Sequence, residues 1–315
     1  MDFTNAELTL HTGVPLPEQL VRNVGNWDQD ALTPGWLESL PATAADLCAK
    51  WGIEIDSVIP DTYITLVILG NSADLGPVVI KSSPLAGEFR AEATALRLGA
   101  SENVSRLYDV DFERSVMVIE RIMPGTMLLN VAMTDEDATQ LAAETIATMW
   151  HSVQNPDGLH PLRQWMRALF EWSPSNRLVA PDLVEHAQKL GASLLAQSTR
   201  NCLLHGDFQH HNLLQRASGN WAIIDPKGLY GDPGFDIAAW MYNPPGVTAR
   251  DDYLELAALR TAICAEVWGI DRQELLAWAF VGAVLNACWS SSDAAPEEWR
   301  IALDRGARQL RTVLR

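Results

Sequence analysis

The sequence predicts an α+β protein with a small mixed-β lobe followed by a larger, mainly helical lobe. From about residue 53 the chain is rich in β-branched residues in short runs bounded by turn signals, which indicates strands. Beyond residue 123, apolar residues recur at helical spacing. A length of 315 residues suits two domains or lobes. We therefore expect a first lobe over residues 1–122, comprising an N-terminal helical extension and the β lobe, and a second over residues 123–315.

In the first lobe, residues 62–81 are typical of a β-hairpin. Tyr63 to Leu69 form a β-branched run, and Gly70-Asn71 after it is a turn signal. The other elements predicted in this lobe are, in order, helices near residues 16–20 and 43–51, a helix over 87–98 and a strand over 116–119. We expect the hinge to the second lobe near residues 120–125, where Pro124-Gly125 precedes the helical pattern.

Two helices of the second lobe have recognisable starts. Thr134 is a suitable N-cap, and acidic residues follow it in the first turn, where the helix dipole favours them. Asp271 and Glu274 form a start like a capping box for a helix that should run to about Trp289. The last 20 residues have the spacing of one more helix.

The charge balance restricts the classes of partner. Lys and Arg number 23 and Asp and Glu number 40, so the formal charge is 23 − 40 = −17. A phosphate backbone or an anionic membrane surface would be repelled, whereas a cationic small molecule would be attracted. The N-terminus lacks the pattern of a signal peptide, and the longest apolar stretch is shorter than the ~18 residues of a spanning helix. We expect a cytoplasmic protein that binds neither nucleic acid nor membrane.

The strongest chemical signal lies between Leu203 and Asp236. It begins with His205-Gly-Asp207 and continues to Asn212, and a short apolar run then ends on Asp225. A buried strand that places a carboxylate in a loop is costly unless that charge has a partner, and a metal ion is the natural one.

The spacing of these residues is that of the catalytic loop of protein kinases, which reads His-Arg-Asp, four residues, then Asn. Asp225, 18 residues after Asp207, occupies the place of the second metal-binding aspartate, although Asp-Pro-Lys replaces Asp-Phe-Gly. Phosphoryl transfer requires Mg²⁺, which prefers carboxylate and amide oxygens. We expect Asp207 to accept the proton of the attacking hydroxyl, and Asn212 and Asp225 to hold the metal.

Upstream, Lys81 ends the run Val-Val-Ile-Lys, which is close to the nucleotide-contacting strand of kinases. Glu88 or Glu92 on the following helix is its expected ion-pair partner, and Glu92 is favoured because it lies deeper in the helix. A single lysine is usually solvated, and Lys81 is a candidate because all these parts occur along the chain in the order found in kinases.

The motif His-Gly-Asp-Phe-Gln-His-His-Asn-Leu-Leu, followed by Ile-Asp-Pro-Lys and Gly-Asp-Pro-Gly-Phe-Asp over residues 224–236, resembles the aminoglycoside phosphotransferases. Within them it is most similar to the streptomycin 6-kinase and hydroxyurea phosphotransferase branch. The resemblance implies a protein-kinase-like bilobal fold, ATP or GTP with Mg²⁺ as cofactors, and a small-molecule hydroxyl as acceptor. It also implies that Lys81, oriented by Glu92, holds the α- and β-phosphates, and that the backbone from Ile119 to Arg121 receives the adenine. The loop over the phosphates should lie near residues 60–63, although it lacks the glycine pattern of kinases.

Several other side chains have a structural and a functional interpretation. His205 more readily orients the loop than takes part in chemistry, and Asp236 more readily ties the loop down than touches substrate. Lys227 would either meet a phosphate or be exposed. Most tryptophans, Trp165 among them, have the spacing of core residues, whereas Trp240 and Trp289 are candidates for the substrate side. Acidic residues that are candidates for binding cations, although usually only solvated, are Asp251, Asp252, Glu255, Asp293, Glu297 and Glu298.

The sequence therefore favours a Mg²⁺-dependent kinase of small molecules, and the resemblance implies a streptomycin-type aminoglycoside as the cationic acceptor. A kinase of an amino sugar or another metabolite is the first alternative, because such enzymes share the catalytic loop. A nucleotide-binding protein without transfer activity is the second. We expect a monomer or a weak dimer.

Overall fold

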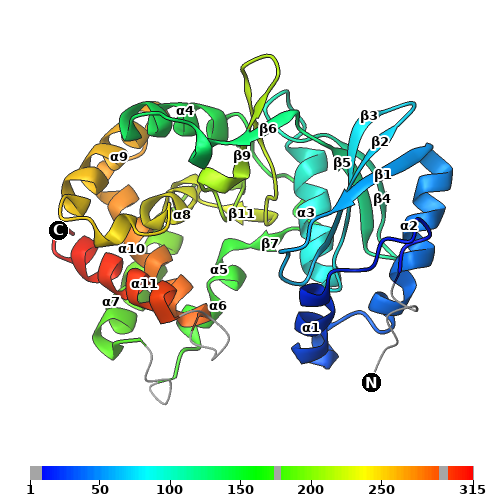
Figure 1. Ribbon diagram of the computed structural model, residues 1–315. Helices are drawn as coiled ribbons and strands as arrows, with labels where there is room; N and C mark the ends of the chain where they lie inside the picture. The colour runs from blue at the N-terminus through cyan, green and yellow to red at the C-terminus, as the bar shows by residue number, and fades with distance from the viewer. Residues whose placement is uncertain (1–8, 174–178, 291–296, 315) are drawn as a thin grey trace.

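The computed structural model describes residues 9–173, 179–290 and 297–314. Its N-terminal part joins two helices, α1 (Glu18–Asn26) and α2 (Trp36–Trp51), to a five-stranded antiparallel sheet. The strands are β1 (Ile53–Val58), β2 (Leu66–Ser72), β3 (Gly76–Ser82), β4 (Leu107–Asp111) and β5 (Val116–Glu120), in the order β1-β2-β3-β5-β4. Helix α3 (Ala86–Leu98) connects β3 to β4. Figure 1 shows these elements on one side of the molecule.

The predicted hairpin forms, but its turn lies elsewhere. β2 continues through Gly70 and Asn71 to Ser72, and the turn occupies residues 73–75. The prediction of a turn at Gly70-Asn71 is therefore wrong. A Cβ at Gly70 would lie 2.8 Å from the carbonyl oxygen of Glu54, so glycine at this position permits the close approach of β1. Tyr63 precedes the strand and is 57 % exposed.

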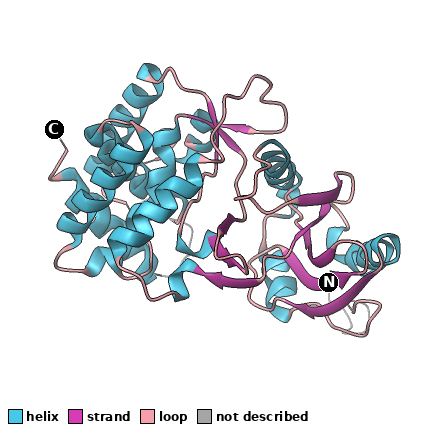
Figure 2. Cartoon of the chain, turned by 90° about the horizontal axis from the view of Figure 1, so that it is seen from above, coloured by secondary structure: helices cyan, strands magenta, loops and turns pink. Residues whose placement is uncertain are grey.

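The rest of the chain is mainly helical, and Figure 2 shows its helices gathered opposite the five-stranded sheet. The longer helices are α4 (Asp135–Ala147), α7 (Pro181–Gln197), α9 (Tyr253–Trp268), α10 (Arg272–Trp289) and α11 (Glu297–Arg311). Shorter helices are α5 (Leu162–Trp165), α6 (Arg167–Phe170) and α8 (Ile237–Tyr242). The side chain of Thr134 accepts a hydrogen bond from the backbone N–H of Asp137, and that of Asp271 from those of Gln273 and Glu274, so both predicted caps are confirmed.

Two small sheets lie among these helices and carry the motif residues. One has the order β10 (Trp221–Ile223), β9 (Leu213–Arg216), β6 (Pro124–Met127), and the other β7 (His160–Pro161), β11 (Leu229–Gly231), β8 (Cys202–Leu204). The chain leaves the large sheet at Glu120 and enters β6 at Pro124, so Pro124-Gly125 lies in a strand. The boundary between residues 122 and 123 stays a prediction.

Three clusters of buried side chains form the interior. One lies between α1, α2 and the sheet, and another lies among α7 to α11. The third joins the two regions, because it contains Phe89 and Leu96 of α3 together with Phe208 and Ile223. The backbone of Ile223 also bonds to the segment before β4, accepting from the N–H of Ser105 at 2.9 Å. α3 and β10 are thereby fixed against each other. Among the described residues, no helix combines the length and apolar character needed to cross a bilayer.

Candidate active site

The loop between β8 and β9 contains Asp207, and a buried histidine sets its shape. The ring of His205 is fully buried, and its Nε2 lies 2.9 Å from the carbonyl oxygen of Ile224. Its Nδ1 lies 3.2 Å from the backbone nitrogen of Asp207. A carbonyl only accepts and a backbone N–H only donates, so Nε2 carries the proton. Burial lowers the pKa of His205 to about 4, which keeps the ring neutral. This supports the structural interpretation of His205.

Asp236 holds the same loop from the other side. Its carboxylate accepts hydrogen bonds from the backbone N–H groups of His205 at 3.0 Å and Gly206 at 2.7 Å, and from the Trp150 indole at 2.9 Å. Gly206 adopts φ +84°, where a side chain would be strained. Burial raises the pKa of Asp236 to about 6, although the three donors act in the opposite direction. Asp236 ties the loop down, as the sequence indicated.

The carboxylate of Asp207 is partly buried in this braced loop and contacts the side chain of Gln209. The Gln209 amide donates to both carboxylate oxygens, at 3.2 and 3.1 Å. Burial, the largest cause, acts to raise the pKa of Asp207, Lys227 and Gln209 act to lower it, and Asp225 acts to raise it; the resulting pKa is about 6. A carboxylate with this pKa is ionised at neutral pH and is basic enough to accept a proton from a hydroxyl.

Asn212 is placed between Asp207 and the end of β10. Its Nδ2 donates to the backbone carbonyl of Asp207 at 2.8 Å, and its own carbonyl accepts from the N–H of Ile224 at 3.0 Å. The amide oxygen is the side-chain atom left for another ligand. Asn212 is therefore hydrogen-bonded to Ile224, which directly precedes Asp225.

Asp225 follows β10 with φ +58° and lies between two lysines. Its Oδ1 pairs with Lys81 and its Oδ2 with Lys227, the second at 2.6 Å. Burial acts to raise the pKa of Asp225, but the charges of Lys81 and Lys227 outweigh it and hold this pKa far below the usual range. The partners seen are thus ammonium groups, where the sequence suggested a metal ion. Lys227 is only partly exposed, because its ammonium group is bound to Asp225, and its contact with a phosphate stays a prediction.

Lys81 connects Asp225 to α3. Its Nζ lies 2.6 Å from Oε1 of Glu92. The ion pair that the sequence favoured, between Lys81 of β3 and Glu92 of α3, is therefore present, and Glu88 is not the partner of Lys81. Burial lowers the pKa of Lys81, but Asp225 and Glu92 raise it more, and the net shift is upward. A small cavity beside this chain of charges is lined by residues from both regions, among them Thr65, Glu88, Phe89 and Trp165.

The donor set fits Mg²⁺. Asp225 offers carboxylate oxygens and Asn212 an amide oxygen, and Mg²⁺ is commonly held by one or two such side chains together with substrate phosphates and water. In the described part of the chain, no group of three or more His, Cys, Asp and Glu side chains is arranged to hold a metal. His210 instead stacks on Trp240, with ring centroids 3.8 Å apart, so the pair His210-His211 offers no transition-metal site.

The expected adenine contacts stay a prediction. Ile119 is buried in β5, paired with Val79 of β3 and Leu107 of β4. The N–H of Arg121 donates to the carbonyl of Pro77 at 3.2 Å, and its guanidinium pairs with Asp56. The backbone donor of Arg121 is therefore already engaged.

Two tryptophan assignments change in the structure. Trp240 is only 2 % exposed and donates to Thr139 at 3.1 Å, so it is a core residue and not a substrate-side candidate. Trp165 was expected in the core but is half-buried and lines the cavity beside Lys81. Trp289 is 37 % exposed and contacts Trp165. The spacing of Trp165 along the sequence could not show that it lines a cavity, because residues in a core and residues in a cavity wall recur with the same helical period.

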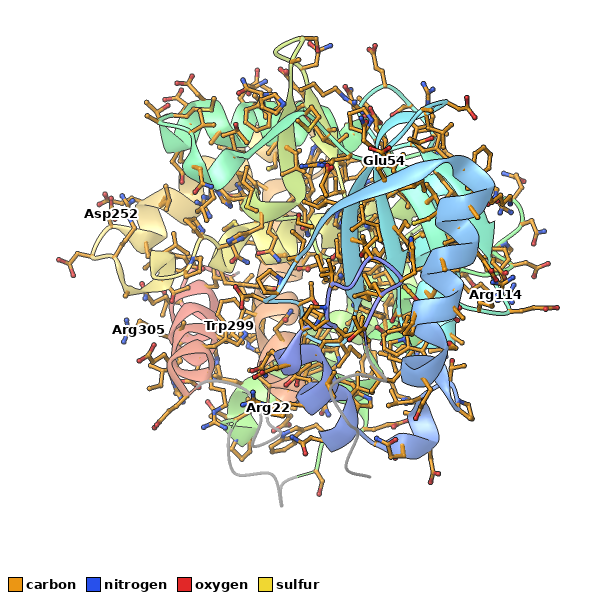
Figure 3. The ribbon with its side chains drawn as sticks, turned by 45° about the vertical axis from the view of Figure 1, so that its right-hand side comes forward. Arg22, Glu54, Arg114, Asp252, Trp299 and Arg305 are labelled. Carbon is orange, nitrogen blue, oxygen red and sulfur yellow. The ribbon has the colours of Figure 1, made fainter. Side chains whose placement is uncertain are left out.

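The acidic candidates lie away from these residues. Asp252 pairs with Arg250 at 2.6 Å, and Figure 3 shows its side chain at the outer edge of the helical region. Asp251, Glu297 and Glu298 are exposed, and Glu255 is not buried. Asp293 lies outside the described residues.

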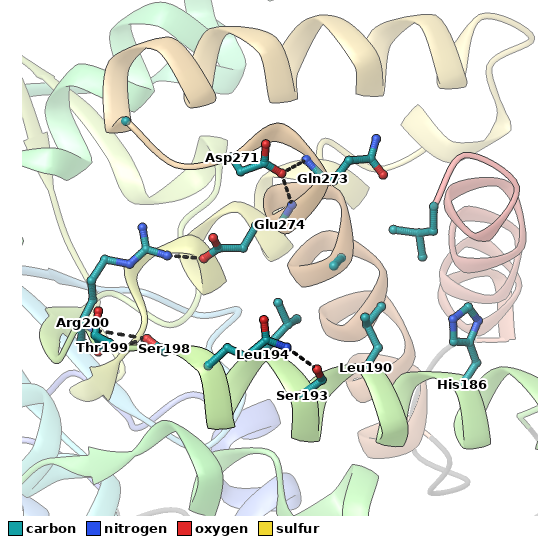
Figure 4. Close-up of a pocket in the computed structure, with 14 residues that line it drawn as sticks. His186, Leu190, Ser193, Leu194, Ser198, Thr199, Arg200, Asp271, Gln273 and Glu274 are labelled. Carbon is teal, nitrogen blue, oxygen red and sulfur yellow. Dashed lines mark hydrogen bonds and ion pairs between the residues drawn. The ribbon is translucent and has the colours of Figure 1, made fainter.

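A cavity of about 870 Å³ between α7 and α10 is separate from the motif residues, none of which lines it (Figure 4). Within it, Arg200 bridges Glu274 of α10 and Asp232. Asp232 accepts from the N–H of Gly234 at 2.8 Å, two residues before Asp236. These contacts support the turn that carries Asp236.

The fold and the braced carboxylates define a small-molecule kinase with a protein-kinase-like architecture. A family model described as "Aminoglycoside/hydroxyurea antibiotic resistance kinase" matches residues 50–294, and the chain belongs to this family. It is 29 % identical over 309 residues to streptomycin 6-kinase of Streptomyces glaucescens, covering 96 % of both chains. It is 26 % identical to streptomycin 3''-kinase of Klebsiella pneumoniae, covering 81 % of this chain and 95 % of that one.

The fold is shared with a solved aminoglycoside kinase. A thermostable mutant of aminoglycoside phosphotransferase APH(4)-Ia, in a ternary complex with ADP and hygromycin B, aligns with a TM-score of 0.61 and 16 % identity. The alignment covers 85 % of this chain and 98 % of that chain. The resemblance inferred from the motif and the kinase-like fold are thus confirmed.

Proposed function

We propose that this protein transfers the γ-phosphate of ATP to a hydroxyl of a streptomycin-type aminoglycoside in the cytoplasm, with Mg²⁺, and so inactivates the antibiotic. One observation carries the proposal. Lys81, Glu92 and Asp225, the first and last of which are 144 residues apart, form a continuous chain of ion pairs beside the loop that holds Asp207. The substrate class is supported by the relatives named above and by the net charge of −17, which favours a cationic acceptor.

In the proposed reaction, Asp207 accepts the proton of the acceptor hydroxyl as its oxygen bonds to the γ-phosphorus. The bond from that phosphorus to the bridging oxygen breaks, and ADP leaves. Lys81 holds the α- and β-phosphates, so these oxygens replace Asp225 as a partner of its ammonium group. Asn212 and Asp225 hold Mg²⁺, which when bound neutralises charge on the phosphate oxygens.

Experiments must identify which nucleotide, ATP or GTP, is the phosphate donor. They must also identify which hydroxyl of the acceptor is phosphorylated. Relatives named for two positions, 6 and 3'', are similar to this chain at nearly equal identity. A kinase of an amino sugar or another metabolite is the alternative that keeps the same mechanism. A nucleotide-binding protein without transfer activity is the second alternative, and such a protein would have no need of Asp207 as a base.

The test is coupled ADP release from the purified protein with ATP and Mg²⁺, using streptomycin, other aminoglycosides, hydroxyurea and amino sugars as acceptors. We expect turnover of streptomycin, its loss on chelation with EDTA and its return with added Mg²⁺. Asp207→Asn should lower kcat at least about 100-fold, because general-base catalysis is removed, while ATP still binds. Turnover of an amino sugar alone would replace the substrate and keep the mechanism, whereas unchanged turnover in Asp207→Asn would refute the mechanism.

A further inference from the structure

A groove of about 740 Å³ opens directly beside the candidate active site. Its lining includes Glu88 and Trp165, which also line the small cavity that contains Lys81, Asp225 and Lys227. The groove is therefore continuous with the place where we put the phosphates. A molecule bound in it would lie next to the cavity lined by Lys81, Asp225 and Lys227.

Aromatic side chains from both regions form the walls of this groove. Trp27, just after α1, packs on the N-terminal core, whereas Trp165 of α5 packs on the helical core. Trp289, at the end of α10, meets Trp165 edge to face with ring centroids 5.2 Å apart. Figure 1 shows α1 below the sheet, and α5 and α6 in the part of the helical region nearest to it.

The wall formed by Trp27 is attached to the loop between β1 and β2. The Trp27 ring packs edge to face on Tyr63, with centroids 5.5 Å apart. In the same place, Nδ2 of Asn23 donates to the carbonyl of Tyr63 at 2.8 Å. The N-terminal helix thus touches both the groove and the loop that we place over the phosphates.

The charge of the groove suits a cation. Among the described residues, Glu88 makes neither a salt bridge nor a hydrogen bond through its carboxylate, and it is exposed at the groove. Arg167 also lines the groove, but Glu171 balances its charge at 3.6 Å. Indole faces attract guanidinium and ammonium groups. The carboxylate of Glu88 lines the same groove and strengthens that attraction, although Lys227 lies close enough to act on it.

Two residues that line the groove each carry a buried polar atom without a partner among the described residues. Nε2 of His160 and Nε1 of Trp165 are buried and form no hydrogen bond to the described residues. Such atoms are uncommon in native interiors and call for a partner. Hydroxyl groups of a polyhydroxylated ligand have the chemistry to serve as that partner.

We propose that this groove holds the cationic part of the acceptor, and that Trp27 is a specificity-determining residue that contacts it. The inference rests on the proposed kinase function and extends it to the N-terminal extension. Trp27 lies outside residues 50–294, which match the family model, so this wall is an addition to the shared catalytic region. The paired wall, Trp165 and Trp289, lies within it.

The experiment compares the wild type with Trp27→Ala and Trp27→Phe. Streptomycin is the probe, through its KM in turnover and its Kd by calorimetry with a non-hydrolysable ATP analogue present. We expect Trp27→Ala to raise both constants about tenfold, equivalent to about 1.4 kcal/mol, and to leave the KM for ATP within about twofold. Trp27→Phe keeps an aromatic face and should recover most of the loss.

Two controls separate contact from general damage. Trp51 is also half-buried against the N-terminal core but precedes β1 at the end away from the loop, so Trp51→Ala should not change either constant. Asn23→Ala removes the hydrogen bond to Tyr63 and leaves the indole in place, so it should not raise the streptomycin Kd.

The outcomes distinguish the two proposals. Normal streptomycin constants in Trp27→Ala, or an equal rise in Asn23→Ala, would overturn the groove assignment and leave the kinase function intact. A wild type that neither binds nor phosphorylates any cationic acceptor would overturn both.

Discussion

Asp207 and Asp236 are neighbouring carboxyl groups whose surroundings assign them different tasks. Asp236 accepts three N–H donors and has no free face, so it acts as an anchor. Among the described residues, the Gln209 amide is the one side-chain hydrogen-bond partner of Asp207, and Asp225 and Lys227 lie close enough to act on its charge. The acid with the freer carboxylate is the one that can exchange a proton.

The pKa of Asp207, raised to about 6 chiefly by burial, predicts an acidic limb in the pH–rate profile. A base must be ionised, and the protonated fraction of Asp207 grows as pH falls through about 6. We expect kcat/KM to fall about tenfold for each pH unit below 6 and to be level above about 7. The measurement is ADP release between pH 5 and 8 at saturating Mg²⁺.

Gln209→Ala supplies the check on that assignment. The Gln209 amide lowers the pKa of Asp207, so its removal should move the limb to higher pH. A limb that stays in place would belong to another group, Asp236 among them, since burial raises its pKa to about 6 as well.

At the scale of elements, the site depends on how strands and helices far apart in sequence are joined. β10 delivers Asp225 because its backbone is bonded on one side to β9 and on the other to the segment before β4. α3 delivers Glu92 because Phe89 and Leu96 pack in the cluster that joins both regions. The ion pair of Lys81 with Glu92 is therefore a consequence of packing as much as of charge.

Arg260 performs a similar joining role for the helices behind the catalytic loop. Its side chain is 1 % exposed, and it pairs with Asp135 of α4 at 2.6 Å. It also donates to the backbone carbonyls of Trp240 and Asn243, the second at 2.8 Å. Burial acts to raise the pKa of Asp135, but the hydrogen bonds and charge of Arg260 outweigh it and lower that pKa.

Arg260→Met should lower the free energy of unfolding by about 3–5 kcal/mol, because it leaves a partly buried carboxylate and two carbonyls without a partner. Arg308→Met is the control, since Arg308 pairs with Asp304 on an exposed helix face and its loss should change stability by less than about 1 kcal/mol. Chemical denaturation at pH 7 measures both. Equal losses in the two variants would contradict the role given to Arg260.

At the scale of the whole molecule, the net charge of −17 acts on every approaching ligand. It attracts a cationic acceptor over roughly the Debye length, about 10 Å at 0.1 M salt. It repels the nucleotide, which relies on the local positive charge of Lys81 and Lys227. The acceptor and the donor therefore respond to salt in opposite ways.

With ATP saturating, kcat/KM for streptomycin should fall severalfold as ionic strength rises from about 0.05 to 0.5 M. Hydroxyurea is uncharged and serves as the control acceptor, if it is turned over, with kcat/KM nearly independent of salt. An uncharged amino-sugar derivative serves the same purpose. No salt dependence for streptomycin would show that the global charge does not guide the acceptor.

Much of the site was predictable because it is encoded locally. The spacing of His205, Asp207 and Asn212 lies within one short loop, and the run ending at Asp225 follows directly. The caps at Thr134 and Asp271 were predictable for the same reason, since each cap contacts only the first turn of its own helix.

Contacts between segments that are distant in sequence could not be predicted in this way. The sequence was sufficient to predict the fold class, the order of the kinase motifs and the preference for Glu92 over Glu88. It did not determine that Lys227 and Lys81 share Asp225, that Trp240 is buried under His210, or that Gly70 lies in a strand. Nor did it place Trp27 across a groove from Trp165. The physical reason is that spacing sets which side chains share a loop or a helix face, whereas packing sets which faces meet.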